Sequence, residues 1–276
     1  MEECRRTNNA ANKEVKGRFG NQHSNPEVSR IKGEEFELDP YQKEVLKTKG
    51  KCNIALKAGR QVGKSTIISH LVGQYAAENK GVQVMVISAT ERQAFLLFQK
   101  ILIFLDNNFK SYVKRGKDRP TKSEIKLNNK SIIRCLPTGL DGLGIRGYTT
   151  DLLVADEAAF IPESVWPAVI PQLATTGGKI ILLSTPMGSE GYFYDSYYDK
   201  DFKTWSINAE ENALHRPEPQ RSWLLDHQEK QKFRMTRLQY AQEYLGEFIS
   251  DFNKVFSDEV VKKACIIDKK KEVLNM

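Results

Sequence analysis

A short glycine-containing segment places the strongest constraint on the fold of this chain. Its residues, Lys57-Ala58-Gly59-Arg60-Gln61-Val62-Gly63-Lys64-Ser65, follow a short apolar run and precede a stretch with helical periodicity. A loop in that position can turn its backbone N–H groups toward a phosphate, and the N-terminus of the following helix favours negative charge. The pattern predicts a phosphate-binding loop, although Ala58 stands where the usual pattern has its first glycine.

The residue types of this loop predict how it would bind a nucleotide. Lys64 supplies a mobile cation for the β- and γ-phosphates, the hydroxyl of Ser65 is a ligand for Mg²⁺, and Gly63 lets the backbone approach closely. Arg60 could reach the γ-phosphate in the transition state, or it could be a surface arginine on a mobile loop. Taken alone, the segment fits an ordinary helix N-terminus equally well, because Gly, Lys and Ser are common residues.

A second segment supports the nucleotide interpretation. The apolar run Leu152-Leu153-Val154-Ala155 has the pattern of a buried strand and ends in two carboxylates, Asp156 and Glu157. Asp156 would hold Mg²⁺ through a water molecule, and Glu157 would be the general base for the attacking water. Two acidic residues after a strand are by themselves more often a turn or a helix cap. Together with the Lys64 loop they favour an ATPase.

From about Phe36, short β-branched runs alternate with amphipathic stretches, which is typical of a parallel sheet covered on both faces. The predicted strands are 53–57, 83–88, 151–155 and 179–184, the predicted helices are 64–79, 91–108 and 162–174, and a hairpin is predicted at 124–127 and 131–135. After about His215 the pattern is helical, at 219–232 and 236–246. The aromatic residues of this region are expected to pack against the sheet domain: Trp223, Phe233, Tyr240, Tyr244 and Phe248. The predicted fold is α/β: a RecA-like (ASCE) P-loop NTPase with a mainly parallel central β-sheet flanked by helices, and a small helical C-terminal subdomain.

Composition predicts three segments along the chain and argues against a zinc site and a membrane span. Residues 1–35 are polar and are predicted to be a flexible tail, residues 36–215 the P-loop ATPase core, and residues 216–276 a helical lid or linker subdomain. The four cysteines lack metal-ligand spacing, and no apolar run is long enough for a membrane span. The N-terminus has no secretory pattern, so the protein is expected to stay inside the cell. A formal net charge of +7 favours contact with polyanions.

Two further segments belong at the expected site. Ser184-Thr185-Pro186 ends a predicted strand, which would place both hydroxyls beside the γ-phosphate, with a plain turn as the alternative. Asp39-Pro40-Tyr41-Gln42 precedes the first predicted strand of the core, and the Gln42 amide can both donate to and accept from an adenine edge. From its residues alone, this segment indicates only the start of a helix.

In their order and spacing, these segments resemble the ATPase domain of the large terminase subunit, the DNA-packaging motor of tailed bacteriophages and related viruses. The resemblance covers about Glu35 to Asp258. It implies that Gln42 reads adenine, that Arg60 acts as an arginine finger in cis, and that Ser184, Thr185 and Pro186 couple hydrolysis to movement. The ATP-binding residues it implies are Gln42, Gly59, Arg60, Gln61, Val62, Gly63, Lys64, Ser65 and Thr66.

The same resemblance gives the Mg²⁺ ligands as Ser65 and Asp156, and the catalytic residues as Glu157, Arg60 and Lys64. Arg146 lies in the glycine-rich loop 142–147, where it would contact a neighbouring subunit's nucleotide or the DNA, or simply be solvated. Large terminases of this family continue into a nuclease domain. The chain ends at Met276, so no DNA cleavage is expected from it, whether it is a fragment or a naturally separate protein.

The resulting hypothesis is an ATP-hydrolysing motor subunit that translocates double-stranded DNA into a procapsid through a portal. The partners implied by the resemblance are double-stranded DNA, the portal protein, the small terminase subunit and further copies of the chain. These copies would form a ring, a pentamer on the procapsid, from subunits that could be monomeric in isolation. The expected cofactors are ATP and Mg²⁺, and the expected location is the cytoplasm of the infected host cell. The alternatives are a helicase-like DNA-dependent ATPase and a non-hydrolysing nucleotide-binding switch or assembly module.

Direct sequence support for DNA binding is limited to one cationic segment, residues 110–122. Such a run is more often a solvated face than a nucleic-acid contact.

Overall fold

The computed structural model describes residues 28–31 and 34–250, and the chain divides into two compact units between Leu38 and Asp39. In the first unit, β1 (Val28–Ile31) and β2 (Glu34–Glu37) pair as an antiparallel hairpin. The prediction of an unstructured tail is therefore wrong for the strand residues up to 35, where Val and Ile favour a strand. The rest of the predicted tail, and residues 251–276 of the predicted helical subdomain, lie outside the described residues.

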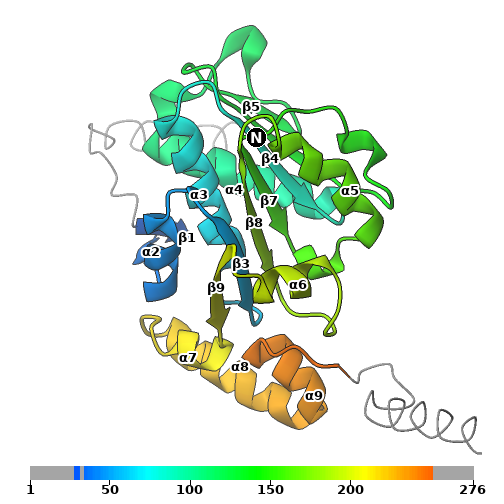
Figure 1. The fold of residues 1–276 in the computed structure, drawn as a ribbon. Helices are drawn as coiled ribbons and strands as arrows, with labels where there is room; N and C mark the ends of the chain where they lie inside the picture. Colours follow the sequence, from blue (N-terminus) through cyan, green and yellow to red (C-terminus); the bar gives the residue numbers. More distant parts are fainter. Residues whose placement is uncertain (1–27, 32–33, 251–276) are drawn as a thin grey trace, which may run out of the picture. The chain divides into compact units, whose positions relative to one another are not determined.

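The second unit is built on a seven-stranded sheet with the order β5-β6-β4-β7-β8-β3-β9 (Figure 1). All neighbouring pairs are parallel except β5 and β6, which are antiparallel. The strands are β3 (Asn53–Ala58), β4 (Gln83–Ser88), β5 (Glu124–Lys126), β6 (Ile132–Pro137), β7 (Leu152–Asp156), β8 (Lys179–Ser184) and β9 (Phe202–Ile207).

Helices cover both faces of this sheet, as a parallel sheet requires. The helices α2 (Pro40–Lys47), α3 (Lys64–Glu78) and α4 (Glu91–Asn108) contribute to one hydrophobic core, and α5 (Trp166–Val169) and α6 (Tyr192–Tyr198) contribute to the other. Successive strand residues alternate between the two cores: Leu152 and Val154 belong to the first, Leu153 and Ala155 to the second. The predicted α/β fold class is confirmed.

The predicted strands agree with the structure to within one or two residues at each end, but one predicted helix of this unit is wrong and one strand was not predicted. A helix over 162–174 does not form: the segment consists of short turns, η6 (Glu163–Val165), α5 and η7 (Ile170–Leu173). Pro167 and Pro171 each lack a backbone N–H and clash with the preceding turn, which prevents a continuous helix. Strand β9 was not predicted; it is a half-exposed edge strand beside β3.

The region after β9 is helical, with α7 (Ala209–Ala213), α8 (Gln220–Arg234), α9 (Arg237–Tyr240) and the π-helical turn η8 (Ala241–Leu245). Tyr240 and Tyr244 are buried in the first core as expected. Trp223 and Phe233 are exposed by 69% and 85%, so the prediction that all these aromatic residues pack inward is wrong for these two. The remaining short turns are η2 (Lys110–Tyr112), η3 (Gly116–Asp118), η4 (Leu143–Ile145) and η5 (Ala158–Phe160).

No helix among residues 28–31 and 34–250 combines the length and apolar character that crossing a membrane would require.

Candidate active site

The loop between β3 and α3 has a backbone suited to binding an anion. Gln61 and Gly63 both have positive φ angles, 62° and 95°. Helix α3 begins at Lys64 with no side chain capping its N-terminus, so its first N–H groups and its dipole can act on an anion in the loop. Thr66, in the first turn, donates its backbone N–H to the Gly63 carbonyl at 3.0 Å.

The side chain of Lys64 connects three parts of the predicted site. Its Nζ donates to Thr185 Oγ1 at 2.8 Å and to the Gly59 carbonyl at 3.3 Å. It also lies 3.5 Å from Glu157 Oε1. The side chain is only 8% exposed, so these contacts form away from bulk water. The structure thus brings together the lysine of the loop, the carboxylate after β7 and the hydroxyl after β8.

Glu157 is held in an unusual conformation at the end of β7. Its φ angle is 52°, a left-handed backbone that residues other than glycine adopt only when the surrounding structure imposes it. Its Oε2 accepts a hydrogen bond from the Thr185 backbone N–H at 3.1 Å and lies 3.3 Å from Ser184 Oγ. Ser184 Oγ in turn accepts from the Ala159 N–H at 3.1 Å. The segment 184–185 therefore orients the carboxylate predicted to be the general base.

Asp156 is buried at the same edge of the sheet. Burial, with repulsion from Glu157 adding to it, raises the pKa of Asp156 to about 6. Asp156 and Ser65 offer hard oxygen ligands of the kind that Mg²⁺ prefers. No cluster of three or more His, Cys, Asp or Glu that could hold a metal occurs within the described part of the chain. The predicted role of the two residues as Mg²⁺ ligands stays a prediction.

Arg60 does not join the Lys64 cluster. Its Nε donates to a carboxylate oxygen of Glu243 in the turn η8, and this hydrogen bond raises the pKa of the guanidinium. The Arg60 side chain is 59% exposed. Its predicted role as an arginine finger stays a prediction.

Gln42 and Tyr41 contact the loop itself. The buried Gln42 amide donates to the Gly63 carbonyl at 3.2 Å and accepts from the Asp39 N–H at 2.9 Å. The Tyr41 hydroxyl donates to the Val62 carbonyl at 2.9 Å. Gln42, which lies in α2, is hydrogen-bonded to the loop in this structure. Its predicted recognition of adenine stays a prediction.

The other predicted residues divide by exposure. Val62, Ser184, Thr185 and Pro186 are buried, whereas Gln61 and Arg146 are exposed. Arg146 directly follows η4, and its predicted contacts stay a prediction.

Sequence reasoning missed a buried ion pair that also supports the loop. Arg216, beyond α7, donates from one terminal nitrogen to Asp39 Oδ2 at 2.5 Å and to the Val62 carbonyl at 3.2 Å. Asn212 of α7 donates to the same Asp39 oxygen at 3.1 Å. Asp39 could have been suspected from its position as the N-cap of α2. Arg216 carries no local signal, because its partners lie far away in the sequence.

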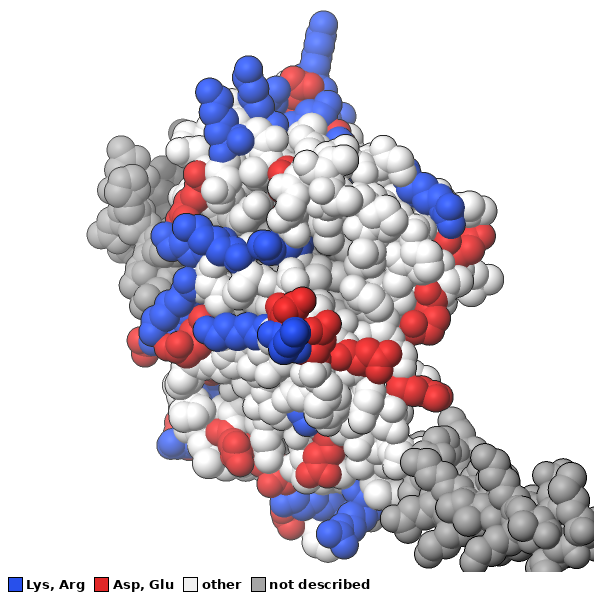
Figure 2. Space-filling model, in the orientation of Figure 1, with Lys and Arg blue, Asp and Glu red and all other residues white. Residues whose placement is uncertain are grey.

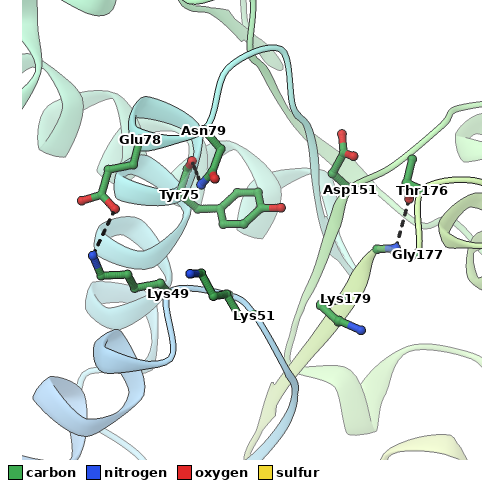
Figure 3. A pocket seen from close by; sticks show the side chains of 11 residues that line it. Lys49, Lys51, Tyr75, Glu78, Asn79, Asp151, Thr176, Gly177 and Lys179 are labelled. Carbon is green, nitrogen blue, oxygen red and sulfur yellow. Dashed lines mark hydrogen bonds and ion pairs between the residues drawn. The ribbon is translucent and has the colours of Figure 1, made fainter.

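The pocket in Figure 3 is separate from this site. Its volume is about 400 Å³, and its charged lining residues are Lys49, Lys51, Glu78, Asp151 and Lys179. Lys49, Lys51 and Asp151 precede β3 and β7, Lys179 begins β8, and Glu78 ends α3. The pocket therefore lies at the opposite edge of the sheet from the Lys64 loop.

Gly59 gives a direct test of how the loop meets the helical region. A Cβ atom at Gly59 would overlap the backbone carbonyl of Tyr244. We expect Gly59→Ala to lower the free energy of unfolding by about 1–3 kcal/mol, because one of the two backbones must move. Denaturant unfolding measures this loss. Gly144→Ala is the control, since its Cβ would meet nothing within 4 Å; equal losses in the two variants would contradict the close contact.

Comparisons with known proteins agree on one family. The family model described as "Terminase large subunit, T4likevirus-type, N-terminal" matches residues 55–262. The large terminase subunits of Thermus virus P23-45 and Thermus phage G20c are each 32% identical to the chain over 130 residues. These alignments cover 41% of the chain and 26% of each relative, so the chain matches about a quarter of their length.

Solved structures show the same fold. The large terminase ATPase domain of Thermus phage P74-26 superposes with a TM-score of 0.60 at 23% identity, covering 75% of this chain and 92% of that one. The HK97 bacteriophage large terminase gives a TM-score of 0.64 at 16% identity, over 84% of this chain and 55% of that one. A large terminase from a thermophilic bacteriophage, solved in complex with ADP, gives 0.62 at 16% identity, over 76% of this chain and 54% of that one.

Proposed function

The chain belongs to the family of the N-terminal region of T4-like-virus-type terminase large subunits, and we propose that it hydrolyses ATP to drive DNA packaging. The observation that carries the ATPase proposal is the cluster of Lys64, Thr185 and Glu157 at the carboxyl edge of the sheet. That edge is where open parallel sheets bind ligands. The ADP complex of the large terminase from a thermophilic bacteriophage supports nucleotide as the ligand.

In the proposed reaction, water attacks the γ-phosphorus of ATP. A P–O bond to the water oxygen forms, the bond to the bridging oxygen breaks, and ADP leaves with that electron pair. Glu157 accepts the proton from water, and Lys64 exchanges its contacts with Glu157 and Thr185 for the phosphate oxygens. A Mg²⁺ ion held by Ser65 and Asp156 would neutralise phosphate charge. Arg60 would add a second cation at the γ-phosphate.

Ser184 and Thr185 are proposed to couple this reaction to movement. They contact the base and the loop lysine at the same time, so a change in phosphate occupancy alters contacts on β8. Translocation of double-stranded DNA through a portal, by a ring of subunits recruited with a small subunit in the host cytoplasm, is the proposed role of the whole protein. Residues 36–215 and 216–276 are proposed as the ATPase core and the helical lid.

DNA stimulation of hydrolysis tests the motor proposal. We expect linear double-stranded DNA to raise the rate of phosphate release by the purified chain, because a motor couples its ATPase to its track. Equal rates of ATP hydrolysis with and without DNA would contradict the motor proposal, because the ATPase would then not respond to DNA.

A basic surface around β5 is the proposed DNA contact. Figure 2 shows Lys and Arg side chains projecting from the end of the second unit where β5 lies. Lys117, Arg119 and Lys122 are exposed there, and none of the three has an ion pair within the described residues. The neighbouring Lys114 and Arg115 are paired with Asp118 and Asp106.

Neutralising these three residues is expected to weaken the salt dependence of DNA binding. With Lys117, Arg119 and Lys122 all changed to Gln, the slope of log K against log salt should become shallower by about 2 to 3, because each phosphate contact contributes about 0.9. Fluorescence anisotropy with labelled duplex at several salt concentrations measures the slope. Lys200→Gln, an exposed lysine beside β9, is the control; an unchanged slope in the triple variant would remove this surface from the DNA path.

A further inference from the structure

The turn η8 sits directly on the start of the phosphate loop. The Arg60 backbone N–H donates to the Glu243 carbonyl at 2.7 Å, and the Gly59 N–H donates to the Ile207 carbonyl at 3.0 Å. Gly59 has no room for a side chain because of the Tyr244 carbonyl. π-helical turns are rare and occur frequently at functional sites. The helical region is therefore joined to the nucleotide loop through residues 243–244.

The same contact includes an ion pair between Arg60 and Glu243, whose side chains differ in solvent exposure. Arg60 is 59% exposed and lies on the loop, whereas Glu243 is 18% exposed and is fixed in η8. Within the described part of the chain, no other cation forms an ion pair with Glu243. Arg60 is thus the partner that is free to move, and its departure would leave the Glu243 carboxylate half-buried without a counterion.

A guanidinium binds carboxylates and phosphates through the same planar set of donors. Arg60 belongs to the loop that is proposed to bind phosphate, so Glu243 and a γ-phosphate compete for it. We propose that Glu243 is a positioning residue that holds Arg60 when no γ-phosphate is present and releases it to a nucleoside triphosphate. This inference rests on the proposed nucleotide site and adds a regulated contact between that site and the helical region.

Competition between Glu243 and the γ-phosphate for Arg60 predicts a change in the relative affinities for ATPγS and ADP. Glu243→Gln removes the competing charge while keeping the size of the side chain, so the affinity for a triphosphate should rise by about two- to fivefold, the effect of one partly exposed ion pair. The affinity for ADP, which has no γ-phosphate, should stay unchanged. In an Arg60→Ala background, Glu243→Gln should have no effect on either nucleotide.

Equilibrium titrations with ATPγS and ADP in the presence of Mg²⁺ test this on four forms: wild type, Glu243→Gln, Arg60→Ala and the double variant. Glu247→Gln, an exposed neighbour, is the control and should bind both nucleotides like the wild type. A rise confined to ATPγS and dependent on Arg60 supports the inference. An equal change for both nucleotides, a change that persists without Arg60, or no change would overturn it. A wild-type chain that binds neither nucleotide would instead overturn the proposed function, and this inference with it.

Discussion

Glu157→Gln is expected to reduce the rate of ATP hydrolysis by about 10²- to 10⁴-fold, the usual contribution of a positioned general base. The amide cannot take the proton from the attacking water. It can still accept the hydrogen bond from the Thr185 N–H that orients the carboxylate in the native protein. ATP affinity should therefore stay close to that of the wild type. Single-turnover phosphate release and equilibrium binding of ATP, measured on the same preparation, separate these two effects.

Glu163→Gln is the matched control for this variant. Glu163 Oε1 accepts from the Tyr192 N–H at 2.9 Å, and Glu163 lies in η6, after the turn that follows Glu157. Its substitution should leave hydrolysis unchanged. If Glu157→Gln also hydrolysed ATP at the wild-type rate, another group would have to be the base, or the activity would belong to a different site.

Arg216→Met is expected to lower the free energy of unfolding by about 3–5 kcal/mol, the cost of leaving a buried charge without its partner. The side chains of Arg216 and Asp39 are only 6% and 1% exposed. Methionine fills similar space but cannot compensate the Asp39 carboxylate, whose pKa is already raised by burial. Denaturant unfolding at neutral pH measures the loss. Nucleotide affinity should fall as well, because Arg216 also donates to the Val62 carbonyl of the loop.

An exposed ion pair provides the comparison. Arg221 pairs with Glu218 at 2.8 Å, and their side chains are 43% and 50% exposed. Arg221→Met should therefore cost less than about 1 kcal/mol. The pH dependence gives a second check. The loss in free energy of unfolding caused by Arg216→Met should become smaller in acid, because a protonated Asp39 needs no counterion. Equal losses in the two variants at neutral pH would show that the buried pair contributes no more than a surface pair.

Local patterns were enough to predict most of the sheet and the centre of the candidate site. β4, β8 and α4 have the predicted bounds, because their sequences combine clear periodicity with strong end signals such as the Thr90 capping box. The proximity of Lys64, Glu157 and Thr185 follows from the topology, since parallel strands place their carboxyl ends at one edge.

Contacts between distant segments could not be predicted in this way. The region after β9 brings Glu243 to Arg60 in the loop and Arg216 to Asp39 at the start of α2. Neither contact leaves a local trace in the sequence. β9 was missed because its alternation is weak and its exposed positions are filled by residues such as Lys203 and Thr204. The segment 162–174 has the apolar periodicity of a helix, but Pro167 and Pro171 divide it into short turns.

We propose that Lys64, Thr185 and Glu157 form one ATP-hydrolysing centre, and phosphate release from ATP by the purified chain tests this directly. Release should require Mg²⁺, stop when EDTA is added, and be lost in Lys64→Ala, with ATP binding lost in that variant as well. Phosphate release that is equal in Lys64→Ala and the wild type, or a wild-type chain that neither binds nor hydrolyses ATP with Mg²⁺ present, would contradict it.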